Sequence, residues 1–211
     1  MREVVVSQRL WLAEAAERAA GFLLTVATSP LLLSSAAAVA ILSRRSPFVA
    51  HLRVGKDHQP FWMLKLRTMW CSGDEVPRKR GWVEYIVAEP AGDGKDADDP
   101  RITSGFAAYC RRHSIDELPQ LWQVARGEMS LVGPRPLTRS EIERYYGAQA
   151  SELLSVKPGI TGLWQVYGRS TIKFPKRSAM DLELVRSLTP RMYLTILLRT
   201  ITAFVSGEGA W

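Results

Sequence analysis

Apolar and charged residues are separated into long blocks near the start of this chain. Ser7–Ala20 places leucine and alanine on one side and acidic and basic residues mostly on another, which predicts an amphipathic helix. Gly21–Leu42 follows without a charged residue, and as a straight helix it would extend about 33 Å, enough to cross ~30 Å of hydrocarbon. A cleaved signal peptide is the alternative, but Glu14 and Glu17 interrupt its basic region and the apolar stretch is overlong.

Ser29-Pro30 lies near the middle of the apolar segment. Proline removes an intrahelical hydrogen bond, and the serine hydroxyl can re-satisfy the exposed backbone group. A sharp break leaves two arms, Gly21–Ser29 and Leu31–Leu42, each too short to cross, so the chain would enter and leave on one side. Positive residues flank both ends of the segment, which favours a common cytoplasmic side. A simple kinked transmembrane helix is the alternative, and these residues alone leave both open.

The remaining pattern predicts a mixed α/β, helix-rich domain that begins near Ser46. Phe61–Met69 and Trp82–Val87 are expected strands, and alternation puts Lys65 and Arg67 on one face of the first. Ala91–Pro100 is an expected polar loop. The expected helices are Ile115–Ala125, Arg139–Leu154, Met180–Leu188 and Arg191–Val205. The last is apolar enough to pack in the core or to lie on a membrane surface. The pattern therefore predicts a membrane-associated part, residues 1–45, and a folded domain, residues 46–211.

Composition narrows the choice of partners. The 211 residues are 46% hydrophobic and 23% charged, so any membrane segment is attached to a folded domain. The net charge of +7 suits nucleic acid, anionic lipid or a small anionic substrate. No basic run alternates with aromatic residues, which disfavours nucleic acid. Two cysteines and three scattered histidines do not form a zinc-binding pattern, and the cysteines are expected to be ordinary thiols.

Asp116 and Glu117 are the centre of the candidate chemistry. One carboxylate can act as a nucleophile while its neighbour holds a hard cation. The alternative is a capping box, in which Ser114 and Glu117 satisfy the first amides of a helix. Several cations crowd the same stretch of sequence, and this favours chemistry on a phosphate: Arg111, Arg112, Arg126 and Arg135. His113 is a weaker candidate for a general base, because neighbouring side chains on a helix point apart.

Two turns follow the carboxylate pair. Gly133-Pro134-Arg135-Pro136 is rigid and presents its arginine with little entropy to lose, although it is equally an ordinary loop, and a cis bond cannot be read from sequence. The segment 157–162, Lys-Pro-Gly-Ile-Thr-Gly, could turn its amides toward an anion, but alone it is better explained as a glycine-rich corner. A degenerate dinucleotide fingerprint at Gly92 is rejected, because no helix follows it.

Together these residues closely resemble the monotopic phosphoglycosyl transferases, bacterial sugar transferases that begin glycan assembly on a polyprenyl phosphate. The resemblance runs from about Gly21 to Trp211 and rests on an ordered set of motifs. They are Ser29-Pro30, RVG at 53–55, KLRTM at 65–69, DDPRIT at 98–103, SIDELPQLWQVARGEMSLVGPRPL at 114–137 and KPGITGLWQVYGRS at 157–170. Leu66 stands where an aromatic residue is usual, and Tyr193 where an aspartate is often found. Neither departure lies in the carboxylate pair.

The resemblance implies roles for individual residues. Asp116 matches the family nucleophile, which attacks the sugar-linked phosphate of a UDP-sugar and releases UMP, and Glu117 matches the partner that ligates Mg²⁺. Arg111 and Arg135 match phosphate- and substrate-binding arginines, and Lys65 and Arg67 are further candidates. Polyprenyl phosphate would then accept the phosphosugar, which starts an exopolysaccharide, O-antigen or glycoprotein glycan.

The family pattern also implies a re-entrant helix broken at Ser29-Pro30, interfacial amphipathic helices, and a catalytic domain on the cytoplasmic face of the bacterial inner membrane. Two other functions stay open: a non-catalytic membrane anchor that recruits glycan enzymes, and a metal-dependent phosphohydrolase. Membrane lipid is an expected partner and nucleic acid is not. The sugar, the downstream glycan and the formation of a homo-oligomer are not encoded in any of these motifs.

Overall fold

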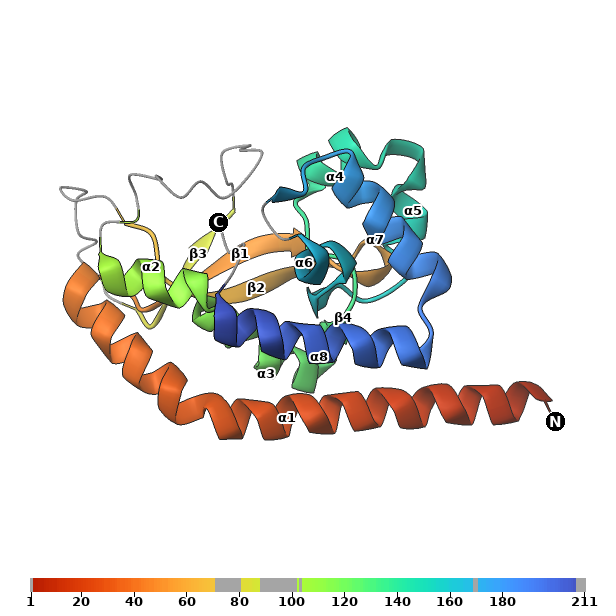
Figure 1. The fold of residues 1–211 in the computed structure, drawn as a ribbon, viewed down its shortest axis with the longest axis horizontal. Helices are drawn as coiled ribbons and strands as arrows, with labels where there is room; N and C mark the ends of the chain where they lie inside the picture. The colour runs from red at the N-terminus through yellow and green to blue at the C-terminus, as the bar shows by residue number, and fades with distance from the viewer. Residues whose placement is uncertain (1, 71–80, 88–101, 103, 169–170, 208–211) are drawn as a thin grey trace.

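The computed structural model describes residues 2–70, 81–87, 102, 104–168 and 171–207, with side chains from residue 12 onward. Two small sheets lie among helices, and the long helix α1 runs along one side of the molecule (Figure 1). The expected mixed, helix-rich α/β class is confirmed. The elements in chain order are α1 Arg2–Ser43, β1 Phe48–Val54, η1 Lys56–His58, β2 Pro60–Leu66, β3 Val83–Ile86, α2 Gly105–Arg112, η2 Ile115–Glu117, α3 Gln120–Arg126, β4 Ser130–Val132, α4 Arg139–Tyr145, η3 Gly147–Gln149, α5 Ala150–Leu153, β5 Gly159–Thr161, α6 Leu163–Tyr167, α7 Lys176–Ser187 and α8 Pro190–Ser206.

Helix α1 passes through Pro30 without ending, so it is one helix and not two separate arms. Pro30 has no amide hydrogen for the Val26 carbonyl, and the Ser29 hydroxyl donates to that carbonyl at 2.8 Å instead. Figure 1 shows α1 bending toward the domain along its C-terminal part, as expected of a proline-containing helix. The re-entrant topology therefore stays a prediction, while the local repair by Ser29 is confirmed.

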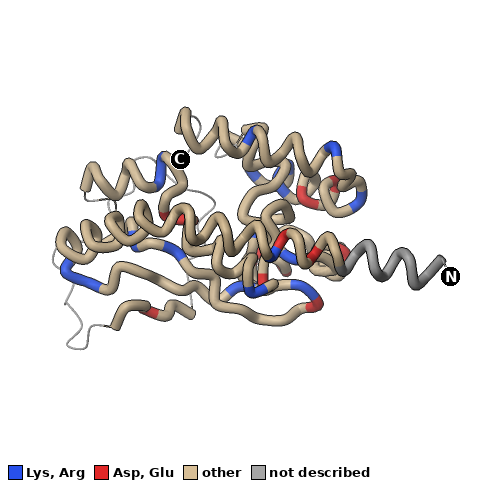
Figure 2. The backbone as a smooth tube through the Cα atoms, turned by 90° about the horizontal axis from the view of Figure 1, so that it is seen from below, with Lys and Arg blue, Asp and Glu red and all other residues tan. Residues whose placement is uncertain are grey.

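The stretch Leu12–Ser43 is long and apolar enough to cross a membrane, with a mean hydropathy of 1.8 in its apolar window, of which 17% is buried. Figure 2 shows the described acidic and basic residues of α1 gathered toward its N-terminal part, followed by an uncharged length. This charged part contacts the domain. Glu17 accepts from the Ser130 hydroxyl and the Leu131 amide at 2.6 and 2.9 Å, and Arg18 Nε donates to the Ala125 carbonyl at 3.1 Å.

Close packing of α1 on α3 depends on Gly21. A Cβ atom at that position would lie 2.9 Å from both the Ala125 amide nitrogen and Val124 Cγ1, closer than side chains approach. Ala20 of α1 packs on the same buried cluster, which includes Leu121 and Val124. The membrane-associated and catalytic parts thus share apolar contacts, and their division at residue 45 stays a prediction.

The three-stranded sheet has the order β2-β1-β3, with β2 antiparallel and β3 parallel to β1. Strand β2 lies at the edge, and the side-chain amide of Gln123 on α3 covers part of that edge. The amide oxygen accepts from Leu64 N and its nitrogen donates to the Trp62 carbonyl, each at 2.8 Å. The Gln123 side chain therefore makes two of the hydrogen bonds that a neighbouring strand would make to β2, and it fixes α3 against β2.

Several expected elements differ from the structure. The expected helix Ile115–Ala125 is a 3₁₀ turn, η2, followed by α3, and the expected helix Arg139–Leu154 is divided into α4, η3 and α5. Gly147, just after the end of α4, adopts a φ of +46°, which an α-helix does not allow. The loop expected at Ala91–Pro100 and the Gly92 fingerprint lie outside the described residues.

Candidate functional site

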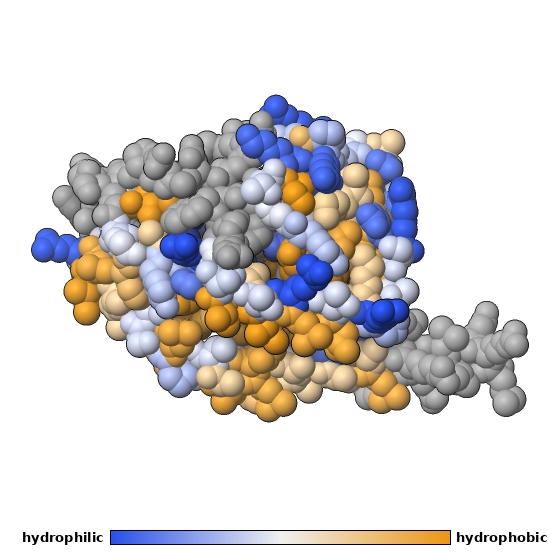
Figure 3. All heavy atoms as spheres, in the orientation of Figure 1, coloured by the Kyte–Doolittle hydropathy of each residue, from blue (hydrophilic) through white to orange (hydrophobic). Residues whose placement is uncertain are grey.

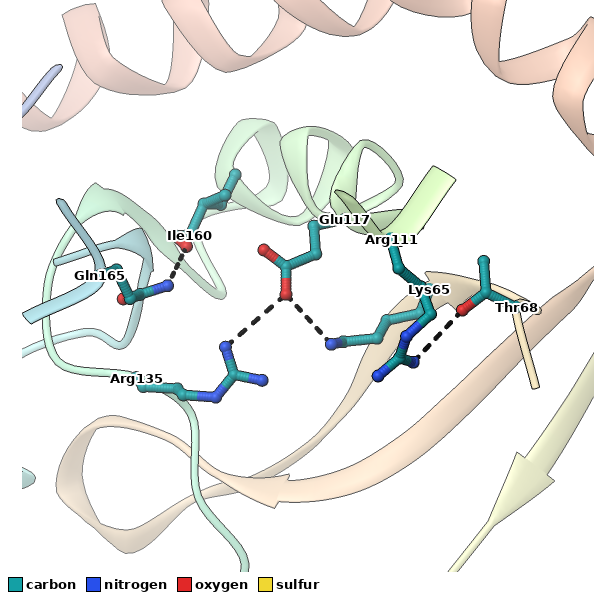
Figure 4. Close-up of polar contacts among 7 residues, drawn as sticks. All are labelled: Lys65, Thr68, Arg111, Glu117, Arg135, Ile160 and Gln165. Carbon is teal, nitrogen blue, oxygen red and sulfur yellow. Dashed lines mark hydrogen bonds and ion pairs between the residues drawn. The ribbon is translucent and has the colours of Figure 1, made fainter. Parts of the chain in front are cut away.

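Glu117 is the point on which two cations from distant parts of the chain converge. Lys65 Nζ of β2 lies 3.1 Å from Glu117 Oε1, and Arg135 Nη1, from the turn after β4, lies 3.6 Å from the same oxygen. Figure 4 shows both cationic side chains pointing at this carboxylate. The Glu117 and Lys65 side chains are only 12% and 13% exposed, so these charges are largely withdrawn from water. The predicted association of Glu117, Lys65 and Arg135 is therefore present.

Asp116 precedes this carboxylate and is 1% exposed. Its charge reaches Cys110 on α2: burial, and secondly the nearby Asp116 carboxylate, raise the pKa of the Cys110 thiol to about 11. Cys110 is therefore a neutral, buried thiol at ordinary pH, as expected for that cysteine, whereas Cys71 lies outside the described residues. Burial withdraws the carboxylate of Asp116 from bulk water.

The backbone explains how two adjacent carboxylates take different positions. Ser114 adopts a left-handed conformation with φ +53°, and the chain then makes the single 3₁₀ turn η2 before α3. The Ser114 side chain makes no capping hydrogen bond to this turn, so the alternative of a capping box at Ser114 and Glu117 is wrong. Glu117 is turned instead toward the cations. The capping box in the described chain is formed by Thr138 and Glu141 at α4, where no prediction placed it.

Arg111 approaches the same region from the last turn of α2. It is 6% exposed, and its Nη1 lies 3.5 Å from Thr68 Oγ1, just beyond β2. The Arg111 guanidinium is thus held inside the protein, five residues before Asp116 in the chain. Figure 4 shows the Arg111 guanidinium contacting Thr68, and its role in phosphate binding stays a prediction.

The turn of Arg135 is held by backbone contacts with the strand β5. Gly133 N donates to the Thr161 carbonyl and Gly159 N to the Pro134 carbonyl, at 2.9 and 2.8 Å. A Cβ atom on Gly159 would lie 2.1 Å from Gly133 N, so only glycine permits this approach. The segment 157–162 is thus a structural corner that positions Arg135, as its simpler interpretation predicted. The cis peptide among the described residues is at Phe174–Pro175, so the Arg135 turn is trans.

Other candidates lie apart from Glu117. The guanidinium of Arg67 donates to the Ser46 carbonyl at 2.8 Å and to Glu84 of β3 at 2.5 Å, and burial lowers the pKa of Arg67. These two hydrogen bonds hold the chain after β2 to neighbouring segments, so the role of Arg67 in substrate binding stays a prediction. His113 Nδ1 bonds the Phe204 carbonyl at 2.9 Å, which anchors α8.

Asp181, Tyr146 and Trp164 form a buried polar network that contacts the Arg135 turn. No prediction from the sequence included this network. Asp181 of α7 is 1% exposed and accepts from the Tyr146 hydroxyl at 2.7 Å. Burial raises the pKa of Asp181 to about 7, and the Tyr146 hydroxyl, the Trp164 indole and the Arg135 backbone amide oppose that rise. The guanidinium carbons of Arg135 and Arg177 lie 5.9 and 4.5 Å from the centre of the Trp164 ring. The only signal in the sequence was a single aspartate between Met180 and Leu182.

Asp181→Asn should change the pH dependence of stability. The folded state holds this proton more tightly than the unfolded chain, whose pKa is near 3.8, so wild-type stability falls as pH rises from about 4 to about 7. The asparagine variant lacks this slope. Its free energy of unfolding, relative to that of wild type, should therefore rise by roughly 4 kcal/mol between pH 4 and pH 8. Chemical unfolding in detergent at several pH values measures this, with the exposed Glu143→Gln as control. Parallel pH profiles for wild type and Asp181→Asn would contradict the assignment.

Comparison with known proteins adds independent information. Residues 8–207 match the family model described as bacterial sugar transferase. The chain is 41% identical over 167 residues to a UDP-galactose-lipid carrier transferase of Erwinia amylovora, covering 79% of this chain and 35% of that protein. It is 38% identical over 192 residues to the exopolysaccharide production protein ExoY of Sinorhizobium fredii, covering 88% and 82%. It is 35% identical over 203 residues to a UDP-glucose:undecaprenyl-phosphate glucose-1-phosphate transferase of Caulobacter vibrioides, covering 91% and 69%.

Proposed function

Because this chain belongs to the bacterial sugar transferase family and is a transferase, we propose that it moves a sugar-1-phosphate from a UDP-sugar to membrane polyprenyl phosphate. Relatives named as undecaprenyl-phosphate galactose and glucose phosphotransferases support this substrate pair. The observation that carries the proposal is the buried Asp116 beside Glu117, which binds Lys65 and Arg135. A binding module or a non-catalytic anchor has no need to bury and neutralise such a pair.

In the proposed first step, a carboxylate oxygen of Asp116 attacks the phosphorus that carries the sugar. The bond between this phosphorus and the bridging oxygen breaks, and UMP leaves with that oxygen. The sugar phosphate stays on Asp116 as an acyl phosphate. Arg111, Arg135 and Lys65 supply the positive charge that two phosphates need as they approach a carboxylate. Glu117 holds Lys65 and Arg135 in place before the substrate arrives.

In the second step, a phosphate oxygen of the polyprenyl phosphate attacks the same phosphorus, and the Asp116 carboxylate leaves unchanged. The product is a polyprenyl-diphospho-sugar. Two displacements at one phosphorus let a soluble donor and a lipid acceptor use the site in turn, which is the general advantage of a covalent intermediate. A phosphohydrolase would instead let water attack, and a buried Asp116 makes this less favourable.

The carboxylate pair also fits the expected cofactor, Mg²⁺. Asp116 and Glu117 offer hard oxygen donors, and no cluster of three or more His, Cys, Asp or Glu occurs among the described residues. Mg²⁺ is commonly held by one or two carboxylates together with substrate phosphates and water, so a two-carboxylate site suits it better than it suits zinc. When bound, the ion would neutralise charge on the diphosphate.

The surface supports a place at the membrane interface. Along α8, four exposed apolar residues recur at helical spacing, namely Leu194, Leu198, Ile201 and Val205, which are 60–72% exposed. Figure 3 shows apolar side chains gathered along α8 and over α1 on the same side of the molecule. An amphipathic helix of this kind lies in the headgroup region of a bilayer. We propose that α1 and α8 hold the site beside the lipid acceptor at the cytoplasmic face of the inner membrane.

Release of UMP tests the function directly. Purified protein in nanodiscs that contain undecaprenyl phosphate is offered a panel of UDP-sugars with Mg²⁺. We expect UMP release and a polyprenyl-diphospho-sugar with at least one donor, UDP-galactose and UDP-glucose being the first to try. Release of free sugar phosphate without the lipid acceptor would identify a phosphohydrolase, and inactivity with every donor would favour the anchor.

The re-entrant topology predicts that both ends of α1 are cytoplasmic. In a background without Cys71 and Cys110, single cysteines are introduced at Ser7 and at the exposed Lys176. We expect an impermeant maleimide to label neither position in intact cells and both after permeabilisation. Labelling of the Ser7 position from outside would show instead that α1 crosses the membrane.

A further inference from the structure

A second concave site lies between the turn after β1, strand β2 and the C-terminal end of α3. Its volume is about 540 Å³, within the range of pockets that bind small molecules. Its lining residues include Lys56, Trp62, Tyr85, Trp122, Arg126 and Lys157. None of these residues has a role in the reaction proposed above. We call this site the aromatic groove.

In the aromatic groove, Trp62, Leu64 and Tyr85 lie on the face of the sheet opposite Lys65, whereas Phe61 shares the face of Lys65, four residues away from it. Side chains alternate along a strand, so Trp62 and Leu64 of β2 face the side opposite Lys65. Register places Trp62 opposite Leu52 and Tyr85 beside Ala50, so the Trp62 and Tyr85 rings lie on one face. A ligand held against these two rings would therefore lie on the face of the sheet opposite Lys65.

Four aromatic side chains line the aromatic groove, and none of them is buried: Phe61, Trp62, Tyr85 and Trp122. The Trp62 and Tyr85 rings meet edge to face with centres 5.0 Å apart, which fixes their orientation. Tyr85 is 61% and Trp122 is 44% exposed. Tryptophan and tyrosine with an apolar body and a polar tip are typical of side chains at the level of lipid headgroups.

The charge of the aromatic groove and its immediate border is positive. Arg126 pairs with Glu128 at 3.0 Å, and Lys157 pairs with Glu14 of α1. Among the residues that line the groove there are three cations, Lys56, Arg126 and Lys157, and one carboxylate, Glu128. Lys56 is exposed at the turn after β1, and the Arg18 side chain of α1 lies 3.5 Å from the point where a Gly127 Cβ would be. The groove thus combines aromatic rings with an excess of cations, and it lies next to α1, the helix that contains the apolar segment.

From this combination we propose that the aromatic groove binds the phosphate headgroup of an anionic membrane phospholipid. The proposal rests on the membrane placement proposed above. Basic residues near a bilayer attract anionic lipid, and indole rings prefer its headgroup region. Lys157 pairs with Glu14 of α1, and Arg18 of α1 donates to the Ala125 carbonyl of α3, so these contacts hold α1 beside the groove. A bound headgroup would therefore fix the angle between α1 and the domain, and with it the height of Asp116 above the lipid.

Retention of phosphatidylglycerol measures this binding. The full chain is reconstituted in phosphatidylcholine nanodiscs with a minor fraction of phosphatidylglycerol, released into mild detergent, and examined by native mass spectrometry. The double variant Lys56→Gln/Arg126→Gln removes two groove cations. The charge-matched control, Arg139→Gln/Lys176→Gln, removes two exposed cations on α4 and α7. Melting temperatures check that both variants are folded, and the single Lys56→Gln variant serves if the double variant is not.

We expect wild type and control to retain phosphatidylglycerol in preference to phosphatidylcholine, with about 25-fold weaker retention in the groove variant, since each cation contributes ~5-fold. Equal retention by the groove variant and wild type, or equal loss in the control, would overturn the proposal. So would displacement by inorganic phosphate, which would show a soluble-anion site, or retention of polyprenyl phosphate instead. In phosphatidylcholine nanodiscs whose only anionic lipid is undecaprenyl phosphate, UMP release should be the same in wild type and the groove variant. Retention of phosphatidylglycerol is measured without any sugar donor, so it tests the groove whether or not the transferase assignment holds.

Discussion

Asp116→Asn should lower kcat by about 10⁴-fold or more, the scale seen when an enzyme loses its nucleophile. Asparagine has nearly the same shape as aspartate, so the 1% exposed position stays filled, but its amide cannot form a stable acyl phosphate. If Asp116 were only a ligand for substrate or metal, some turnover would remain and would rise with the concentration of either. We expect no such rescue, because the lost step is bond formation.

The proposed covalent intermediate should be detectable in wild type without the lipid acceptor. With a UDP-sugar alone, one equivalent of UMP per protein should appear in a burst and then stop. Trypsin after Arg112 and Arg126 yields a peptide that contains Asp116 and Glu117, and acid-quenched samples should show it heavier by one phosphosugar. Fragmentation should place the added mass on Asp116.

The matched control is Asp57→Asn, which changes an exposed aspartate in the turn after β1 and should keep both the burst and the steady-state rate. Steady turnover with an unmodified peptide at every time point would contradict a covalent mechanism, since the lipid would then attack the UDP-sugar directly. A modified Glu117 would reverse the roles of the two carboxylates.

Sequence predicted best where one element carries a long pattern. Alternation along β2 is a local pattern, so the sequence predicts the face on which Lys65 lies. The Ser29 hydroxyl and the carbonyl that Pro30 leaves without a donor lie within one helical turn, so their hydrogen bond is predictable as well. Strands β4 and β5 were missed because each has three residues and their pairing joins positions about thirty residues apart. Periodicity has no meaning over three residues, and distant pairing is not encoded locally.

The candidate site shows the same limit. Proximity in the sequence brings Asp116, Arg111 and Arg135 to attention, and the family resemblance assigns a role to each. The contacts that hold these residues in place were not accessible, because they depend on which buried polar groups meet after folding. Gln123 closing the edge of β2 and Asp181 beneath the Arg135 turn are examples. Polar residues with such roles look like ordinary surface residues in a sequence.

The structure gives a physical reason for one departure from the family pattern. Tyr193 stands where an aspartate is often found, and its hydroxyl donates to Glu17 Oε1 of α1 at 2.6 Å. The same Glu17 oxygen accepts from Ser130 and Leu131 of β4, the strand that leads into the Arg135 turn. A tyrosine can donate to this carboxylate where an ionised aspartate would repel it. This chain thus connects α1 to the catalytic turn through Glu17, and Tyr193 is a compatible replacement.

Glu117→Gln should have the second-largest effect, a fall in kcat of about 10²- to 10³-fold, the scale for removing one preorganised electrostatic group. Glutamine keeps the shape of the side chain but removes the charge that holds Lys65 and Arg135 at 3.1 and 3.6 Å. The two cations would then repel each other without compensation. Unlike Asp116→Asn, this variant should still form the adduct on Asp116, only slowly, because the nucleophile is intact.

The dependence on Mg²⁺ separates the two proposed roles of Glu117. If it ligates the ion, Glu117→Gln should raise the Mg²⁺ concentration needed for half-maximal rate, whereas loss of cation positioning alone would lower kcat at every Mg²⁺ concentration. Glu143→Gln, which removes an exposed carboxylate paired with Arg139 on α4, should change neither quantity. A Glu117→Gln variant with wild-type rate and wild-type Mg²⁺ dependence would remove Glu117 from the chemistry and leave its ion pairs as structural contacts between β2 and the Arg135 turn.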